Sequence, residues 1–139
     1  MVYMKRVIGL GGVFFKAEKP KDLQKWYETH LGIEPDSDGF ITFKWLEKDP
    51  PNRHGHTVWG PFQGDTKYFE PSKAPFMFNF RVDNLEALLD ELRKEGVTVI
   101  DKTMEDENGK FGWVMDPEGN KIELWEPAEA TYNKEWYER

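Results

Sequence analysis

The chain carries an internal repeat. Residues 12–17 are apolar and β-prone and are followed by a helical stretch and a glycine, and residues 77–82 open the same pattern again. The closing segments, which begin at Thr57 and at Glu123, also match. A repeated unit of a strand, a helix and several strands limits the possible folds more than composition does. The second copy therefore ends in a carboxylate where the first has a hydroxyl.

Composition is typical of one compact domain. A chain of 139 residues with 38% hydrophobic and 15% aromatic residues can bury a proper core. The formal net charge of −7 repels a phosphate backbone, and no stripe of lysine and arginine overcomes it locally, so we expect no nucleic-acid partner. No stretch approaches the roughly 20 apolar residues that span a bilayer, so we expect no membrane partner.

The sequence also predicts a location. Its first residues lack the long apolar segment of a secretory signal, so we expect the protein to stay in the cytoplasm. The chain has no cysteine, which excludes disulfides, thiolate chemistry and cysteine-bound metals. This fits a reducing compartment without requiring one.

In the first half, apolar residues recur at the spacing of a helix after Pro20, and a glycine follows them as a natural C-terminal cap. Glycines at 9, 11 and 12 interrupt the strand before this helix, which indicates that another backbone or a ligand approaches it closely. The predicted elements are a strand at 7–17, a helix from Pro20 to Gly32, a strand at 40–46, a turn-rich segment at 49–56 and a closing strand from Thr57.

In the second half, residues 83–86 are typical of a capping box, and four leucines between 85 and 92 form one apolar stripe of a helix that ends before Gly96. Residues 116–120 are a strong hairpin signal, because aspartate, proline, glycine and asparagine favour tight turns. The predicted strands of this half lie at 76–82, 97–100, 111–115 and 121–125.

We therefore predict a single domain. It consists of two modules at 7–62 and 76–127, a connector at 63–75 and a C-terminal tail at 128–139. Tyr68 and Phe69 lie in the connector and could fold back over a pocket. The tail is charged with three interspersed aromatic residues, and it reads either as a short packed helix or as a frayed end.

Alternation along the strands predicts a pocket. If the side chains of Phe78 and Phe80 pack against the second helix, the alternate residues of the same strand face the other side of the sheet. Apolar walls with a few convergent polar groups are typical of a small-molecule site. The alternative is a second small core or a dimer surface in which Glu123 pairs with a lysine or arginine. The residues predicted on this face are Phe14, Lys16, Thr57, Trp59, Met77, Asn79, Arg81, Glu123 and Trp125, with Trp113 as a further ligand contact.

The second module opens with Phe-Arg-Val-Asp-Asn-Leu at 80–85 and closes with Asp-Pro-Glu-Gly-Asn-Lys-Ile-Glu-Leu-Trp at 116–125. These motifs resemble the vicinal oxygen chelate superfamily, which includes glyoxalases, bleomycin-resistance proteins and extradiol dioxygenases. The resemblance covers roughly residues 7–127. It implies an α+β fold in which two βαβββ modules form a curled mixed sheet around a shared cavity, with the helices on its outer face. It also implies a homodimer, since a partner often completes the cavity.

The resemblance further implies metal ligands, usually His or Glu, on the first and last strands of each module. In this chain those positions hold Gly12, Thr57, Met77 and Glu123. A divalent cation held by one carboxylate and one hydroxyl would remain mostly solvated and weakly bound. We therefore expect no metal cofactor.

An alternative metal set consists of His54, His56 and Glu123. By alternation His56 faces away from the pocket, and His54 lies in the turn-rich segment. A shift of one residue in that strand would reverse the direction of both side chains. We keep this set as a second hypothesis for a divalent metal.

Two functions follow for the pocket. In the first, the protein binds a flat, partly apolar organic molecule between the aromatic residues, without metal, as the resemblance to bleomycin-resistance proteins implies. In the second, which resembles glyoxalase I, the protein is a lyase or isomerase in which Glu123 removes a proton next to a carbonyl. Arg81, Lys16 or Asn79 would then stabilise the developing oxyanion.

A third hypothesis is an interaction module whose exposed aromatic residues bury against a partner protein. A filled cavity and a large apolar patch elsewhere would favour it. Dioxygenase activity ranks last, because it requires a redox metal and a strong facial set of ligands. The ligand itself is not encoded, since one superfamily fold supports many chemistries.

Overall fold

The computed structural model describes residues 6–36, 41–47 and 54–128. This part of the chain contains seven strands and two helices, in the order that the two-module repeat predicts. The first half contains β1 (Val7–Ala17), α1 (Pro20–Leu31), β2 (Ile41–Leu46) and β3 (His54–Gln63). The second half contains β4 (Phe76–Val82), α2 (Leu85–Lys94), β5 (Thr98–Asp106), β6 (Gly109–Met115) and β7 (Lys121–Pro127).

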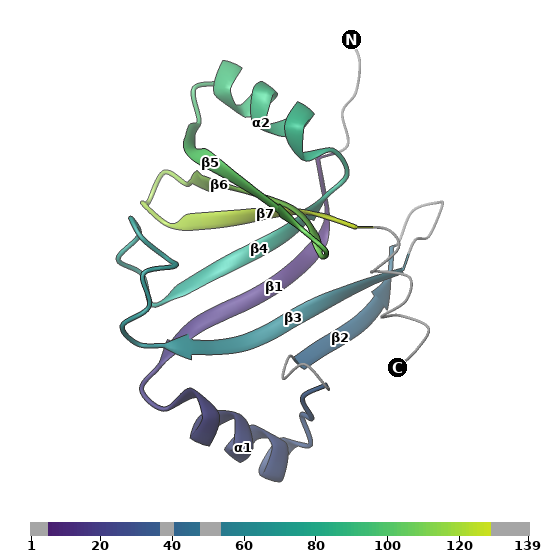
Figure 1. The fold of residues 1–139 in the computed structure, drawn as a ribbon, viewed down its shortest axis with the longest axis vertical. Helices are drawn as coiled ribbons and strands as arrows, with labels where there is room; N and C mark the ends of the chain where they lie inside the picture. The colour runs from purple at the N-terminus through teal and green to yellow at the C-terminus, as the bar shows by residue number, and fades with distance from the viewer. Residues whose placement is uncertain (1–5, 37–40, 48–53, 129–139) are drawn as a thin grey trace.

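All seven strands form one mixed sheet in the order β2-β3-β1-β4-β7-β6-β5 (Figure 1). The first strands of the two halves, β1 and β4, pair antiparallel at its centre. Each is flanked by the last strand of its own half, β3 or β7, in parallel. Because β2 and β5 are edge strands, the sheet of the described residues curls without closing into a barrel. The predicted α+β fold with a curled sheet is confirmed.

The two halves differ in one respect. The second half has the complete strand-helix-three-strand unit, whereas the described residues of the first half supply two strands after the helix. The closing strand β3 also begins at His54, three residues before the predicted start, so the histidines at 54 and 56 lie in a strand.

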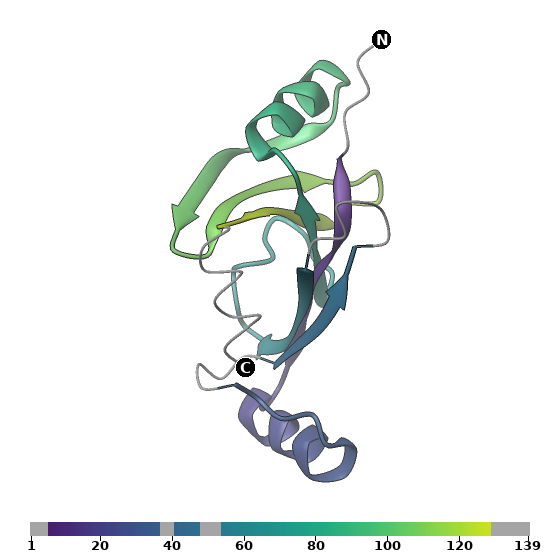
Figure 2. The same cartoon turned by 90° about the vertical axis from the view of Figure 1, so that its right-hand side faces the viewer.

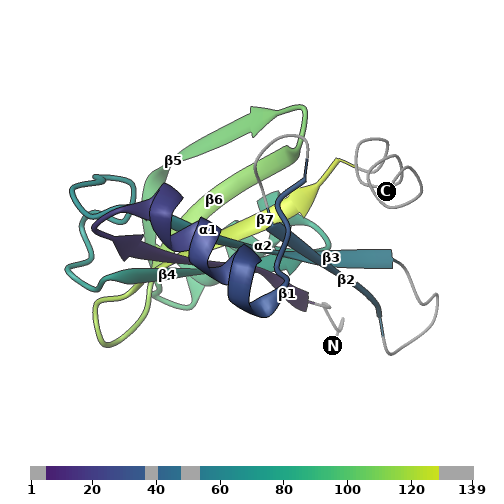
Figure 3. The same ribbon diagram turned by 90° about the horizontal axis from the view of Figure 1, so that it is seen from below.

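The helices lie outside opposite ends of the curled sheet, as the view along the sheet shows (Figure 2). Viewed from below, α1 lies across the sheet end formed by the first half (Figure 3). The connector between β3 and β4 turns back between the two halves of the curled sheet (Figure 2). No helix among the described residues has the length and apolar character needed to cross a membrane.

The main hydrophobic core lies under α2. Three of its leucines, Leu85, Leu88 and Leu89, are buried against Val114 of β6 and Leu124 of β7. The helix begins at an N-cap Asn84, whose side chain accepts a hydrogen bond of 3.1 Å from the backbone of Ala87. This confirms the predicted helix, but its cap is Asn84 with Ala87 and not the capping box from Asp83 to Glu86. Residues 129–139 of the predicted tail lie outside the described residues.

The predicted hairpin between β6 and β7 is also present. The backbone amide of Asp116 donates to the carbonyl of Asn120 at 2.9 Å, and Gly119 adopts a φ of 82°. A residue with a side chain is strained in this left-handed region, which explains the glycine. The turn fixes the register of β7 against β6 and thereby the side of the sheet that Glu123 faces.

Candidate functional site

The candidate site is centred on the carboxylate of Glu123, which is buried with 3% of the residue exposed. The side-chain amide of Asn79 donates to Oε1 at 2.6 Å. The indole of Trp113 donates to Oε2 at 2.9 Å, and the hydroxyl of Tyr68 donates to the same oxygen. Three donors from three different segments therefore hold one carboxylate inside the protein.

Sheet register explains why these groups meet. Glu123 of β7 lies beside Asn79 of β4 on one side and beside Trp113 of β6 on the other. Neighbours in register project to the same face of a sheet, so the three side chains converge on the face away from α2. The prediction that Asn79 and Glu123 share this face is confirmed.

A glycine in β1 makes room for this arrangement. A Cβ atom at Gly11 would clash with Oδ1 of Asn79 and would lie 3.1 Å from atoms of Arg81 and Trp125. The pairing of β1 with β4 is irregular between Leu10 and Gly12, and Gly11 lies at this bulge. The glycine-interrupted strand seen in the sequence thus allows close approach by side chains of the neighbouring strands.

The connector covers the carboxylate. Phe69 is fully buried and packs with Met77 and Trp113 on the same face of the sheet, where Phe14 and Phe62 contact the cluster. The ammonium of Lys16 lies 5.8 Å from the centre of the Phe69 ring. The expectation that Tyr68 and Phe69 fold back over this face is confirmed.

Lys121 attaches the connector to the sheet. Its ammonium donates to the backbone carbonyl of Tyr68 at 2.7 Å. It also lies 5.3 Å from the ring centres of Tyr68 and Trp113, within the range of cation–π attraction. Sequence reasoning missed Lys121, although its position two residues before Glu123 places both side chains on one face.

The surroundings of Glu123 shift the pKa values of two side chains, Tyr68 and Lys121. Burial raises the pKa of the Tyr68 hydroxyl, and the nearby charge of Glu123 raises it further. The hydroxyl therefore keeps its proton and acts as a donor. Burial lowers the pKa of Lys121, while the charge of Glu123 opposes that shift.

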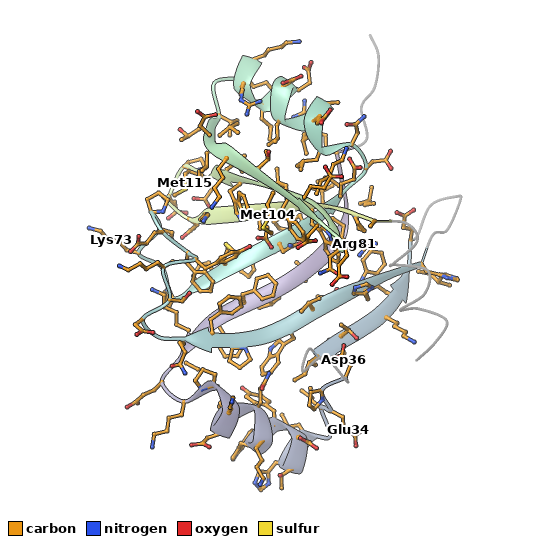
Figure 4. All side chains as sticks on the ribbon, viewed as in Figure 1. Glu34, Asp36, Lys73, Arg81, Met104 and Met115 are labelled. Carbon is orange, nitrogen blue, oxygen red and sulfur yellow. The ribbon has the colours of Figure 1, made fainter. Side chains whose placement is uncertain are left out.

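A second group of side chains lies beside the carboxylate on the same face. The guanidinium of Arg81 lies 4.9 Å from the ring centre of Trp125 and 5.6 Å from that of Trp45. Trp125 stacks on Phe111 with ring centres 5.9 Å apart. Figure 4 shows Arg81 near the centre of the curled sheet. Arg81 and Trp125 thus share the predicted face, where the guanidinium packs on two aromatic rings.

The structure corrects two predicted positions. Trp59 faces α1, because its ring centre lies 4.8 Å from Tyr27 of that helix and 5.0 Å from Phe15. Thr57 is tied into the sheet, since its hydroxyl donates to the carbonyl of Leu10 at 2.6 Å and accepts from the indole of Trp45 at 2.8 Å. Neither residue joins the cluster around Glu123.

The cause is a shift in the repeat. Phe14 corresponds to Asn79 in the two first strands, and it lies beside Gly60, whereas Asn79 lies beside Glu123. The first-half counterpart of Glu123 is therefore Gly60, three residues beyond Thr57. An odd shift reverses the face of every side chain in a strand, which turns Trp59 toward the helix.

The same shift changes the direction of His56. His56 is buried, and its ring centre lies 5.6 Å from that of Trp125, so it faces the pocket side, contrary to the alternation-based expectation. Even so, the described residues contain no group of three or more His, Cys, Asp or Glu side chains placed to hold a metal ion.

The donor set around Glu123 does not fit a divalent cation. A cation needs several oxygen or nitrogen atoms with lone pairs directed at it. Here the amide of Asn79, the indole of Trp113 and the hydroxyl of Tyr68 all direct hydrogen atoms at the carboxylate. The family positions at Gly12 and Met77 supply no strong ligand for such a cation.

The comparisons with known proteins agree with this fold. Residues 12–125 match the family model described as a glyoxalase-like domain. The chain belongs to this family. Among curated proteins, none matches the sequence. The resemblance to the vicinal oxygen chelate superfamily is thereby confirmed.

Solved structures share the fold at low sequence identity. Methylmalonyl-CoA epimerase from Mycobacterium tuberculosis is 24% identical with a TM-score of 0.54, over 92% of this chain and 93% of that one. The NAD-dependent benzaldehyde dehydrogenase structure from Legionella pneumophila is 16% identical with a TM-score of 0.56, over 84% and 98%. The 2,3-dioxygenase LapB from Pseudomonas sp. KL28 is 23% identical with a TM-score of 0.55, over 90% of this chain and 42% of that one.

Proposed function

We propose that this glyoxalase-like protein binds a small, partly aromatic or carbonyl-containing organic molecule on the inner face of its sheet, without a divalent metal. The observation that carries the proposal is the buried carboxylate of Glu123 with its three donors. Burying a charge costs several kcal/mol, and an apolar residue of similar size would pack a purely structural core as well or better. Shifted titrations around a buried carboxylate are more common at functional sites than elsewhere.

The aromatic surroundings support a flat ligand. Trp113, Phe62, Phe14 and Met77 form an apolar wall on the same face as the carboxylate. Such a wall with a few polar groups provides both affinity and orientation for a small organic molecule. The carboxylate would accept a hydrogen bond from the ligand, in the manner of a sequestering protein.

Binding can be tested by ultrafiltration of the pure protein with a library of small aromatic and carbonyl compounds, followed by mass spectrometry of the retained compounds. We expect retained compounds to be lost in Glu123→Gln and kept in the control Glu118→Gln, whose side chain is exposed in the hairpin. Equal retention by both variants, or retention of no compound by the natural protein, would contradict the proposal.

Metal independence needs its own measurement. We expect elemental analysis of protein purified with metal-replete controls to give far less than one metal ion per chain, and we expect chelator to leave ligand retention unchanged. This follows from the hydrogen-bond donors that surround Glu123. One tightly held ion per chain would instead revive the set of His54, His56 and Glu123.

A second candidate function is that of a lyase or isomerase with Glu123 as general base. The observation in its favour is the direct contact between the carboxylate and the Tyr68 hydroxyl, because such a pair can pass a proton between them. Asn79, one of the three proposed oxyanion donors, donates a hydrogen bond to Glu123. Solvent deuterium exchange at the carbon next to the carbonyl of a retained compound tests this, and exchange that persists in Glu123→Gln would exclude the role.

We also propose that the protein is a homodimer. Several large apolar side chains of the first half are exposed in one chain, among them Trp26 and Leu31 of α1 and Phe43 and Leu46 of β2. An interface between two chains would remove these side chains from water. Light scattering during gel filtration should give twice the chain mass of 16.4 kDa.

The cytoplasmic location of the protein remains a prediction.

A further inference from the structure

The Tyr68 side chain lies in a site built for a phenol. Its ring stacks on Phe62 with ring centres 5.8 Å apart and meets the ring of Trp113 edge-on at 6.2 Å. The ammonium of Lys121 lies 5.3 Å from its ring centre, and its hydroxyl donates to Glu123. Both the ring and the hydroxyl of the phenol thus have complementary partners on the sheet.

The origin of Tyr68 differs from that of its partners. Asn79, Trp113 and Glu123 lie on paired strands, whereas Tyr68 lies in the connector between β3 and β4, which has no regular strand or helix. Tyr68 is half-buried, so part of this residue borders solvent. A connector can leave such a position while the strands keep theirs, since fewer backbone hydrogen bonds hold it.

With the connector in place, no ligand can reach the carboxylate, since Glu123 and Phe69 have almost no exposed surface. Binding at Glu123 therefore requires Tyr68 to move. The group that replaces it must restore the hydrogen bond to Oε2, or a buried acceptor loses part of its pairing.

We propose that Tyr68 is a built-in competitor that occupies the ligand position, and that the site, once the connector opens, takes a neutral phenol or a similar hydroxyl-bearing aromatic molecule. This inference rests on the proposed function, because it assigns the ligand class and the regulation of the same site. It makes the connector at 64–75 the element that gates access to Glu123.

Charge determines which aromatic molecules fit. The group in contact with Glu123 must bring a proton, because a phenolate or a carboxylate would place a second negative charge beside a buried one. Tyr68 itself keeps its proton here, since burial and the charge of Glu123 raise its pKa. An aromatic molecule without a hydroxyl would fill the space but leave Oε2 with the indole of Trp113 alone.

The probe for this inference is p-cresol, which has the structure of a tyrosine side chain, with toluene as the probe that lacks the hydroxyl. We expect Tyr68→Ala to bind p-cresol at least about tenfold more tightly than the natural protein does, and toluene about tenfold more weakly than p-cresol. The matched control Tyr68→Phe keeps the ring in place, so we expect it to gain no affinity for p-cresol.

An engineered cavity alone would also bind p-cresol, so the natural protein supplies the deciding readout. We expect saturating p-cresol to increase amide hydrogen exchange across residues 64–75 of the natural protein while exchange in β6 and β7 stays unchanged. Unchanged exchange in the connector would overturn the inference even if Tyr68→Ala binds the probe. Should Tyr68→Ala fail to fold, the exchange measurement on the natural protein and the affinity of Tyr68→Phe for p-cresol still test the inference.

A third variant tests the attachment of the connector. Lys121→Met removes the hydrogen bond to the Tyr68 carbonyl and should increase connector exchange without any probe. Failure of the inference is distinguishable from failure of the proposed function. In the first case the library compounds still bind in a manner that depends on Glu123, while p-cresol leaves the connector protected. In the second case the natural protein retains no compound at all.

Discussion

The two helices occupy corresponding places in the repeat but differ in how they are held. α2 buries three leucines and begins with an asparagine cap, whereas α1 buries none of its residues completely and has no side-chain cap at Lys19. Both helices are followed by a glycine with positive φ, Gly32 at 69° and Gly96 at 83°. The similarity lies in the local signals, and the difference lies in what covers each helix.

The comparison shows what helical periodicity can and cannot predict. Apolar residues recur at the right spacing in both segments, so both form helices. In α2 that stripe packs on the sheet, while in α1 Trp26 remains 51% exposed and Leu31 remains 60% exposed. The contact between Tyr27 and Trp59 is one of the links that hold α1 to the sheet. We therefore expect the second half to dominate the stability of the isolated chain.

The largest expected effect comes from removing one leucine of α2. Leu88→Ala should lower the free energy of unfolding by about 3 kcal/mol, because it leaves a cavity in the main core. The chemically identical change Leu31→Ala in α1 should cost less than about 0.5 kcal/mol when the protein is dilute enough to be monomeric, because Leu31 is exposed in the single chain. Urea unfolding of the dilute protein, followed by tryptophan fluorescence, measures both. Equal losses at this dilution would show that α1 is held as firmly as α2 within one chain.

A smaller effect is expected at the helix starts. Asn84→Ala should cost about 1 kcal/mol, because the amide of Ala87 loses its side-chain acceptor. Lys19→Asp should instead stabilise α1 by about 0.5 kcal/mol, since it supplies the missing cap and a favourable charge at the helix start. The same urea measurements serve for both. A lower free energy of unfolding in Lys19→Asp would mean that Lys19 has a role that the contacts of α1 do not show.

Sequence reasoning predicted the fold and the second half of the site because both depend on local patterns. The hairpin at 116–120 fixes the register of β7, so the inward direction of Glu123 followed from alternation. Asn79 followed from the alternation of β4 with the apolar stripe of α2. These inferences needed no information from distant parts of the chain.

The first half was less predictable because its closing strand is shifted against the repeat. Matching Thr57 to Glu123 in the repeat predicted the wrong face for Trp59 and His56. The strand β3 begins at His54, and Gly60 takes the position that corresponds to Glu123. The connector contributed the other surprise. No periodic pattern could show that the Tyr68 hydroxyl reaches Glu123 or that Lys121 holds its carbonyl.

The smallest expected effect concerns the charge in the hairpin of the second half. Hydrogen bonds from the backbone and side chain of Asn120 lower the pKa of Asp116 below its usual value, and further bonds come from the backbone amides of residues 118 and 119. Because the folded state binds its proton less readily than the unfolded state, this carboxylate stabilises the fold fully above the unfolded pKa of about 3.9. The contribution declines as the pH falls through the folded pKa.

Asp116→Asn tests whether the well-packed half also depends on this turn charge. The side-chain oxygen of the new asparagine can still accept the backbone hydrogen bonds. Its NH₂ group replaces the second oxygen of Asp116 and cannot accept the hydrogen bond from the Asn120 side chain. We expect the urea midpoint of the variant to lie below that of the natural protein at pH 6, and the gap to narrow as the pH falls below about 3.9. Glu118→Gln, in the same turn, should show no such narrowing. A gap that is constant with pH would mean that the α2 core holds the hairpin without help from the charge of Asp116.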